Sequence, residues 1–199
     1  MQGKSPYVVK VDSDIELRIR TENEAEELFN LIQNNKEHLG KFLYWINKAN
    51  AFSYIKEFAH KYLIGYEGGT SCDFGIYFKD KMIGSGGFHR INQTHKKGEI
   101  EYWISEEYEG RGIVTKAVQK IIEIGREKYN LHRIVIMINT ENEESKAIPK
   151  KLGFKYEGTM EYDKYINGKF ISTEIWSLIL CPVKKEINNK TEDHKCNGK

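Results

Sequence analysis

The chain has 199 residues, and 39% of them are hydrophobic, which suits one domain with a single core. Its 31 basic and 29 acidic residues leave a net charge of +2, a balance that argues against a nucleic-acid-coating protein. No apolar run approaches the roughly 20 residues that span a bilayer, and no signal-peptide segment follows Met1, so we expect a cytoplasmic protein without membrane contacts. Cys72, Cys181 and Cys196 form neither a Cys-x-x-Cys pair nor a zinc pattern, so we expect free thiols and no bound metal.

The N-terminal part of the chain predicts a strand and two helices. Residues 15–20 alternate between apolar and polar side chains, as in a half-buried strand. Thr21 and Glu24 have the spacing of a capping box, and a helix is predicted to follow them. Apolar side chains at helical spacing mark both helices: Ala25, Leu28, Phe29 and Ile32 in the first, and Phe52, Ile55, Phe58, Ala59 and Tyr62 in the second. We interpret the second, aromatic stripe as core rather than as a cofactor contact.

The middle of the chain predicts a run of strands and then a long helix. Residues 73–78 and 81–90 indicate a hairpin, joined by a turn at Lys79 and Asp80. A third strand is predicted over residues 98–105, and an amphipathic helix from about residue 113 to residue 129.

The last part of the chain predicts more sheet. Residues 133–139 are almost all apolar, which is typical of a strand buried on both faces. The other elements predicted here are a short helix after Asn142, which Pro149 should kink or shorten, and strands over residues 154–160 and 170–180. We expect one domain over residues 1–182 and a polar, disordered tail over residues 183–199.

Gly110 and Gly112 lie at the junction between the third strand and the long helix. Glycines allow a positive φ and close approach of the backbone to a ligand, while the free N–H groups and dipole of the helix attract an anion. Thr115 stands where a dinucleotide fingerprint has its third glycine, and the Gly-Lys-Ser/Thr ending of a Walker A loop is absent. The junction therefore predicts a site for another phosphate-bearing cofactor.

This loop resembles the acyl-CoA loop of the GNAT superfamily of N-acetyltransferases, Gln/Arg-x-x-Gly-x-Gly/Ala, with Glu107 in the leading position. Residues 142–158 are similar to the Asn-x-x-Ser…Lys-Leu-Gly-Phe…Glu-Gly block of the RimJ/RimL branch, and residues 38–46 resemble its His-Leu…Trp segment. The resemblance implies an α/β (α+β) GNAT fold: a mixed, mostly antiparallel twisted sheet, splayed at the acyl-CoA site around Trp103 and Ile136 and flanked by about four helices. It also implies acetyl-CoA as cofactor and direct transfer in a ternary complex.

The same resemblance implies a set of cofactor-binding residues. They are Trp103, Ile104, Glu109, Gly110, Arg111, Gly112, Ile113, Val114, Thr115, Asn142 and Ser145. Asn142 is in addition a good helix N-cap whatever its role.

Acyl transfer to an amine needs a proton acceptor, because most amines are protonated at neutral pH. The resemblance places Glu99 at the family's strand glutamate, and Glu101 shares its strand face, where two acids can raise each other's pKa. A solvated strand face or a structural ion pair is the other interpretation. Ser145 matches the serine that relatives place near the thiol sulfur, although water can also protonate the leaving thiolate, and a first-turn helix residue is the alternative. Many relatives carry a tyrosine where this chain has Pro149.

The acceptor site is predicted to include Trp45, His89 and Glu161, with Asp163 as a further candidate. Trp45 suits a cleft wall or core packing, and His89 suits a structural hydrogen bond or a secondary base. The RimJ/RimL resemblance implies a protein N-terminal amine as acceptor, with a ribosomal protein first, and leaves a homodimer open. A small-molecule amine acetyltransferase and a noncatalytic acyl-CoA-binding module are the alternatives, the latter because Glu107, Pro149, Glu161 and Ser172 depart from the family pattern.

Overall fold

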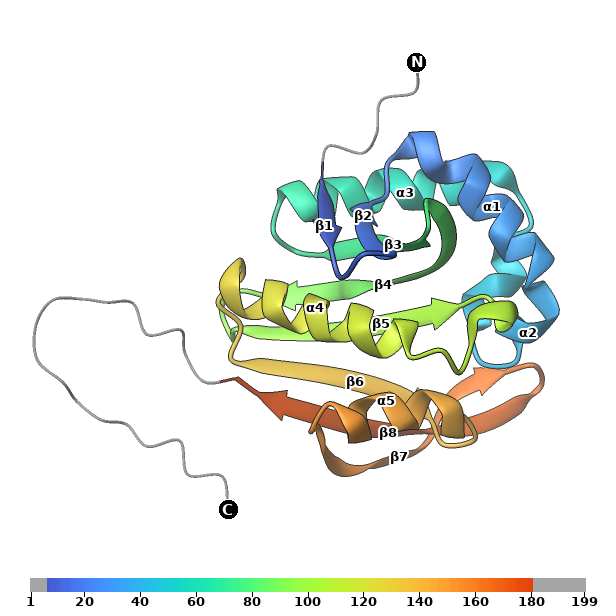
Figure 1. Ribbon diagram of the computed structural model, residues 1–199. Helices are drawn as coiled ribbons and strands as arrows, with labels where there is room; N and C mark the ends of the chain where they lie inside the picture. The colour runs from blue at the N-terminus through green and yellow to red at the C-terminus, as the bar shows by residue number, and fades with distance from the viewer. Residues whose placement is uncertain (1–6, 181–199) are drawn as a thin grey trace, which may run out of the picture.

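The computed structural model describes residues 7–180, which form one mixed eight-stranded sheet with helices on both faces (Figure 1). The strand order is β1-β2-β3-β4-β5-β6-β8-β7, and only β5 and β6 are parallel neighbours. The strands are β1 (Val8–Lys10), β2 (Ile15–Ile19), β3 (Cys72–Phe78), β4 (Lys81–Asn92), β5 (Lys97–Ile104), β6 (Arg133–Asn139), β7 (Lys155–Ile166) and β8 (Lys169–Ile179). The α-helices are α1 (Ala25–Asn34), α2 (Lys36–Gly40), α3 (Phe52–Glu67), α4 (Ile113–Glu127) and α5 (Glu143–Lys151). Short 3-10 helices lie at η1 (Glu22–Glu24), η2 (Tyr44–Lys48) and η3 (Glu106–Tyr108).

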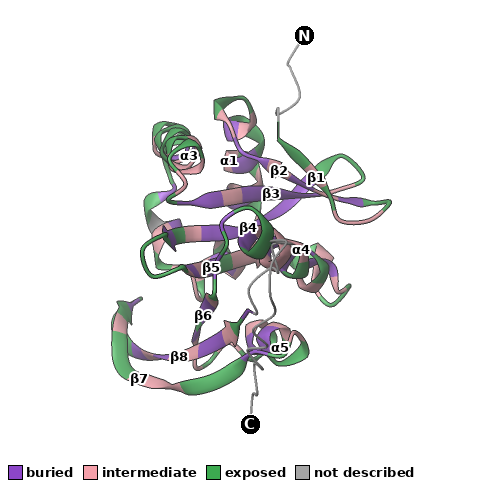
Figure 2. Ribbon diagram, turned by 90° about the vertical axis from the view of Figure 1, so that its left-hand side faces the viewer, coloured by how far each residue is buried: buried purple, intermediate pink, exposed green. Residues whose placement is uncertain are grey.

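Two hydrophobic clusters hold the layers together. One joins α4 to a face of the sheet, where Ala117, Val118 and Ile121 are fully buried against strand residues. The other joins α1, η2 and α3 to the opposite face. Figure 2 shows α1 and α3 on the other side of the sheet from α4. Burial of large apolar side chains on both faces supplies the main stabilisation of the sheet.

Two local sequence signals, a capping box and a tight turn, have the structure that was predicted for them. Thr21 Oγ1 accepts from the Asn23 N–H and Glu24 Oε2 accepts from the Thr21 N–H, which completes the predicted capping box. Lys79 and Asp80 both take positive φ, at 50° and 64°, as the tight turn between β3 and β4 requires. The predicted fold is confirmed, with five α-helices in the described residues rather than about four.

The sheet opens between β5 and β6. Their parallel pairing runs only from Lys97↔Arg133 to Ile100↔Ile136, after which the two strands diverge. The last four residues of β5 pair with β4 alone, and the last three residues of β6 pair with β8 alone. The expected splay is therefore present. The expectation that β6 is buried on both faces was wrong at Met137, which is 37% exposed.

The β7–β8 hairpin is longer than predicted and bends toward α2 (Figure 1). Our expected strand ended at Met160, but β7 continues to Ile166 beyond an irregularity in which Tyr162 takes a φ of 52°. At the hairpin tip Asn167 Nδ2 donates to the Gly40 carbonyl at 3.1 Å. The hairpin thus meets α2 across the open side of the split sheet.

Several other features were not predicted or differ in detail. β1, α2 and η2 had no expected counterpart, because each is only three to five residues long and too short for a periodic signal. Pro149 lies inside α5, which is nine residues long and ends two residues later. Cys72 is buried and free, and burial raises the pKa of its thiol to about 11. Cys181, Cys196 and the expected tail at 183–199 lie outside the described residues.

No helix in the described part of the chain is long and apolar enough to cross a membrane. Within residues 7–180, no group of three or more His, Cys, Asp or Glu side chains is arranged to hold a metal ion.

Candidate active site

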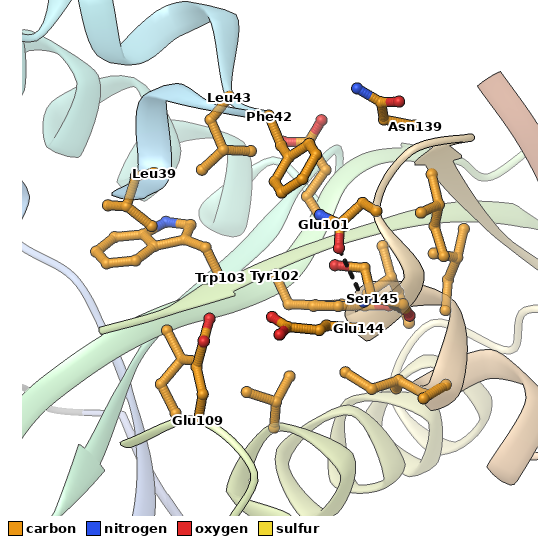
Figure 3. A pocket seen from close by; sticks show the side chains of 18 of the residues that line it. Leu39, Phe42, Leu43, Glu101, Tyr102, Trp103, Glu109, Asn139, Glu144 and Ser145 are labelled. Carbon is orange, nitrogen blue, oxygen red and sulfur yellow. Dashed lines mark hydrogen bonds between the residues drawn. The ribbon is translucent and has the colours of Figure 1, made fainter. Parts of the chain in front are cut away.

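A cavity of about 530 Å³ occupies the split between β5 and β6. Its walls come from α2 and η2 on one side and from α4, α5 and the β7–β8 hairpin on the others. Leu39, Phe42 and Leu43 face Tyr102 and Ser145 across it (Figure 3). This volume is within the range of small-molecule sites, so the splay creates room for a ligand that crosses the sheet.

The glycine loop forms the cavity edge at the start of α4. Gly110 and Gly112 have φ of 69° and 72°, and no described atom beyond the adjacent residues in the chain would lie within 4 Å of a Cβ on either residue. Gly112 is the N-cap of α4, and Ile113, Val114 and Thr115 of the first turn line the cavity. The loop therefore presents open backbone and a helix N-terminus, which fits the pyrophosphate of a CoA molecule.

All the predicted cofactor residues except Arg111 line this cavity. Arg111 Nη2 donates to the Glu107 carbonyl at 2.7 Å, and its guanidinium lies 4.9 Å from the Tyr108 ring centre. Glu107, the departure from the family pattern, is also outside the cavity and pairs with Lys81 Nζ at 3.0 Å. The hydrogen bond from Lys81 lowers the pKa of Glu107, and the cation offsets the carboxylate charge beside the loop.

The two candidate bases have different surroundings. Glu101 lines the cavity, whereas Glu99 does not. Glu99 lies 3.4 Å from both Lys97 Nζ and His89 Nε2, and 3.9 Å from Arg90 Nη1. The difference follows from the split, because Glu99 is on the paired part of β5 and Glu101 is beyond it. Glu99 thus lies among nitrogen atoms of His89, Arg90 and Lys97, whereas Glu101 is the one of the two acids that lines the cavity.

On the α5 side, Asn142 Oδ1 accepts from the Ser145 N–H at 3.0 Å, which makes Asn142 the N-cap. The Ser145 carbonyl accepts from Tyr102 Oη at 2.9 Å (Figure 3). Burial raises the pKa of Tyr102, so its phenol remains protonated. We did not predict Tyr102, although the period-two pattern places it on the opposite strand face from Glu101.

The predicted acceptor residues are not all in one place. Trp45 lines the main cavity and stacks on Phe58 at a centroid distance of 5.9 Å. His89 lines a smaller cavity that adjoins the first. Glu161 and Asp163 line neither, and Glu161 Oε2 accepts from Ser172 Oγ at 3.0 Å. Glu161 and Ser172, which both depart from the family pattern, are therefore hydrogen-bonded to each other.

The model of the acetyltransferase (GNAT) domain family matches residues 14–155. The chain belongs to the GNAT family. It is 32% identical over 174 residues to the "Putative ribosomal N-acetyltransferase YdaF" of Bacillus subtilis, an alignment covering 87% of this chain and 95% of that one. It is 27% identical over 172 residues to the "Ribosomal-protein-serine acetyltransferase" of Escherichia coli, covering 86% and 96% of the two chains.

Among solved structures, the GNAT chain is similar to the microcin C7 self-immunity acetyltransferase MccE, which was solved with acetyl-CoA and AMP. The TM-score is 0.84 at 29% identity, and the match covers 88% of this chain and 98% of that one. These findings confirm the predicted family, the N-acetyltransferase class and the use of acetyl-CoA.

Proposed function

We propose that this GNAT protein acetylates the N-terminal α-amine of a protein, with a ribosomal protein as the first candidate, by direct attack in a ternary complex. The observation that carries the proposal is the pair of diverging strand edges. Residues 101–104 of β5 and 137–139 of β6 line the cavity without pairing to each other. Such edges can bind an extended peptide by main-chain hydrogen bonds. The two relatives named for ribosomal-protein acetylation support the same acceptor class.

At the cofactor end, Gly110, Gly112 and the first turn of α4 would hold the pyrophosphate, and Asn142 would contact the pantetheine arm. Acetyl-CoA supplies an activated thioester there. The protein's part is mainly to orient the thioester and the amine and to move protons.

At the acceptor end, Glu101, which lines the cavity, would take a proton from the incoming ammonium group, directly or through a water. Ser145 or water would protonate the leaving thiolate, since CoA thiols resemble cysteine in acidity. Tyr102 fixes the first turn of α5 through the Ser145 carbonyl, and so holds Ser145 beside the cavity.

A small cationic amine is the second candidate, and one observation favours it. Glu101, Glu109 and Glu144 all line the cavity, which gives an ammonium group several carboxylates to meet. However, Lys151 and Lys164 line the same cavity, and His38 lies 2.8 Å from Glu109. The mixed charge suits one ammonium group on a peptide better than a polyamine.

Thiol release from acetyl-CoA tests the proposal. Purified protein would be given peptides that begin with Ser or Ala, then spermidine, and then an amino sugar. Turnover of the peptides above the small amines supports the proposed acceptor. The reverse ranking favours the second candidate, and acetyl-CoA binding without any turnover would mark a noncatalytic module.

A further inference from the structure

A second, small cavity of about 30 Å³, which we call the back chamber, adjoins the main cavity. The two cavities share three lining residues, which are Trp45, Glu101 and Trp103. The back chamber is otherwise lined by Arg20, Phe58, Tyr62, Asp73, Ser85 and His89. A water needs about 10–15 Å³ of such volume, so the back chamber is the size of two or three waters at most.

The back chamber is polar, and two of the nitrogen atoms of its lining residues have no hydrogen-bond partner within residues 7–180. Arg20 is buried and forms an ion pair with Asp73, which also accepts from Ser85 Oγ at 3.2 Å. Arg20 Nε and His89 Nδ1 are both buried, and neither has a hydrogen-bond partner among the described protein atoms. Unpaired buried nitrogens are costly, and ordered water is their usual partner.

A bulge in β4 places His89 between two carboxylates. The β4–β5 register shifts between Phe88 and Arg90, so His89 is the extra residue in the ladder. His89 Nε2 lies 3.4 Å from Glu99, and His89 Nδ1 lies 4.0 Å from Glu101. The second distance is too long for a direct hydrogen bond but suits a bridging water.

Glu99 connects His89 to the protein surface. Its carboxylate contacts Lys97 and Arg90, whose side chains are 39% and 71% exposed. Glu101, His89 and Glu99 therefore form a series of titratable groups that runs from the main cavity, past the back chamber, to solvent.

We propose that His89 is a positioning residue for acetyl transfer that relays the amine's surplus proton from Glu101, through water in the back chamber, to Glu99 and solvent. The inference rests on the proposed acetyl transfer but not on which amine is the acceptor. Transfer forms a C–N bond and breaks the C–S bond, whose electron pair stays on sulfur. An ammonium acceptor loses two protons, of which one goes to the thiolate and one must leave the site.

The relay is needed once an acceptor occupies the main cavity. The Glu101 side chain is 61% exposed in the open cavity, and a bound acceptor would cover it. The back chamber is then its remaining route to solvent. The charged and titratable groups that face His89 are Glu99 and Glu101 from β5, Asp73 from β3, Arg20 directly after β2 and Tyr62 from α3.

His89→Gln tests the relay, because glutamine can still hydrogen-bond to Glu99 but cannot accept and pass on a proton. We expect kcat to fall about tenfold near pH 6, where the acceptor arrives as ammonium, and to approach wild type near pH 9. His60→Gln is the matched control, since His60 is an exposed, ion-paired histidine on α3, and should leave the profile unchanged. A His89→Gln profile that overlays wild type, or one lowered equally at every pH, would overturn the relay.

A crystal structure provides a readout that does not depend on activity. We expect ordered water within about 3 Å of His89 Nδ1 and Arg20 Nε, and a dry back chamber would contradict the inference. The kinetic test works with whichever amine is acetylated. A wrong acceptor assignment would change the substrate ranking and leave the His89 effect in place, whereas a failed relay would leave the ranking intact.

Discussion

His38 Nε2 lies 2.8 Å from Glu109 Oε1, a contact that joins α2 on the acceptor side to the glycine loop on the cofactor side. The same histidine lies 3.7 Å from Glu106 through Nδ1. Asn35, between α1 and α2, accepts from Ser105 Oγ and the Glu106 N–H with its side-chain oxygen. The loop is therefore held from the acceptor side of the cavity as well as by its own helix.

We expect His38→Ala to weaken acetyl-CoA binding by about threefold to tenfold, because a hydrogen bond to a charged partner contributes roughly 1 kcal/mol or more to ordering the loop. Calorimetric titration would measure the change. His60→Ala is the control, since His60 contacts Glu22 at 3.3 Å far from the loop. Equal affinities in the two variants would show that the contact does not order the loop.

Gly112→Val should weaken acetyl-CoA binding by at least about tenfold while the domain stays folded. A β-branched residue at a φ of 72° costs roughly 1–3 kcal/mol of strain and places side-chain atoms where the backbone should meet phosphate. Gly69→Val makes a comparable change at a φ of 69° after α3, away from the cavity. Titrations of both variants, with circular dichroism as a check on folding, separate strain from lost binding. Wild-type affinity in a folded Gly112→Val protein would exclude this loop as the phosphate site.

Glu101→Gln should lower turnover about a hundredfold near pH 6 and less near pH 9, where more of the amine is already neutral. Glu57→Gln, on the exposed surface of α3, should match wild type throughout. Glu99→Gln should have a smaller effect than Glu101→Gln, because Glu99 lies outside the main cavity. The pH dependence of kcat for the three variants gives the comparison, and an unaltered Glu101→Gln profile would rule Glu101 out as the base.

Glu157 gives a prediction about folding stability. Its hydrogen bonds with Arg133 and Ser177 lower the pKa of its carboxyl to about 2. Because the folded-state pKa is lower than the unfolded one, the stabilisation is present above about pH 4.5 and is lost as the pH falls toward 2. Glu157→Gln should therefore lower Tm at neutral pH and converge with wild type in acid. A difference in Tm that stays constant from pH 7 to about pH 2 would contradict this linkage.

The sequence predicted the parts of the site that depend on backbone conformation. Gly110 and Gly112 were identifiable because the loop needs positive φ before a helix, and both glycines have it. The strand face shared by Glu99 and Glu101 was also predictable from the period of two. The sequence did not show which of these two acids lines the cavity, because that depends on the residue at which β5 diverges from β6.

Other parts of the site arise from long-range contacts. Tyr102 reaches Ser145, and Asn167 reaches Gly40, across 43 and 127 positions of sequence, and no local pattern reports such pairs. The extension of β7 was missed because the irregularity at Tyr162 breaks the strand's alternation. The hydrogen bond between Ser172 and Glu161 likewise depends on the pairing of β7 with β8, which local sequence does not specify.

The most direct test of the central claim is acetylation of one peptide that begins with Ser and contains lysines, followed by mass spectrometry of the product. We predict a single acetyl group on the α-amine, turnover above that of spermidine at equal concentration, and loss of turnover when the α-amine is blocked while the lysines stay free. Retained turnover of the blocked peptide, or faster acetylation of spermidine, would contradict the N-terminal assignment.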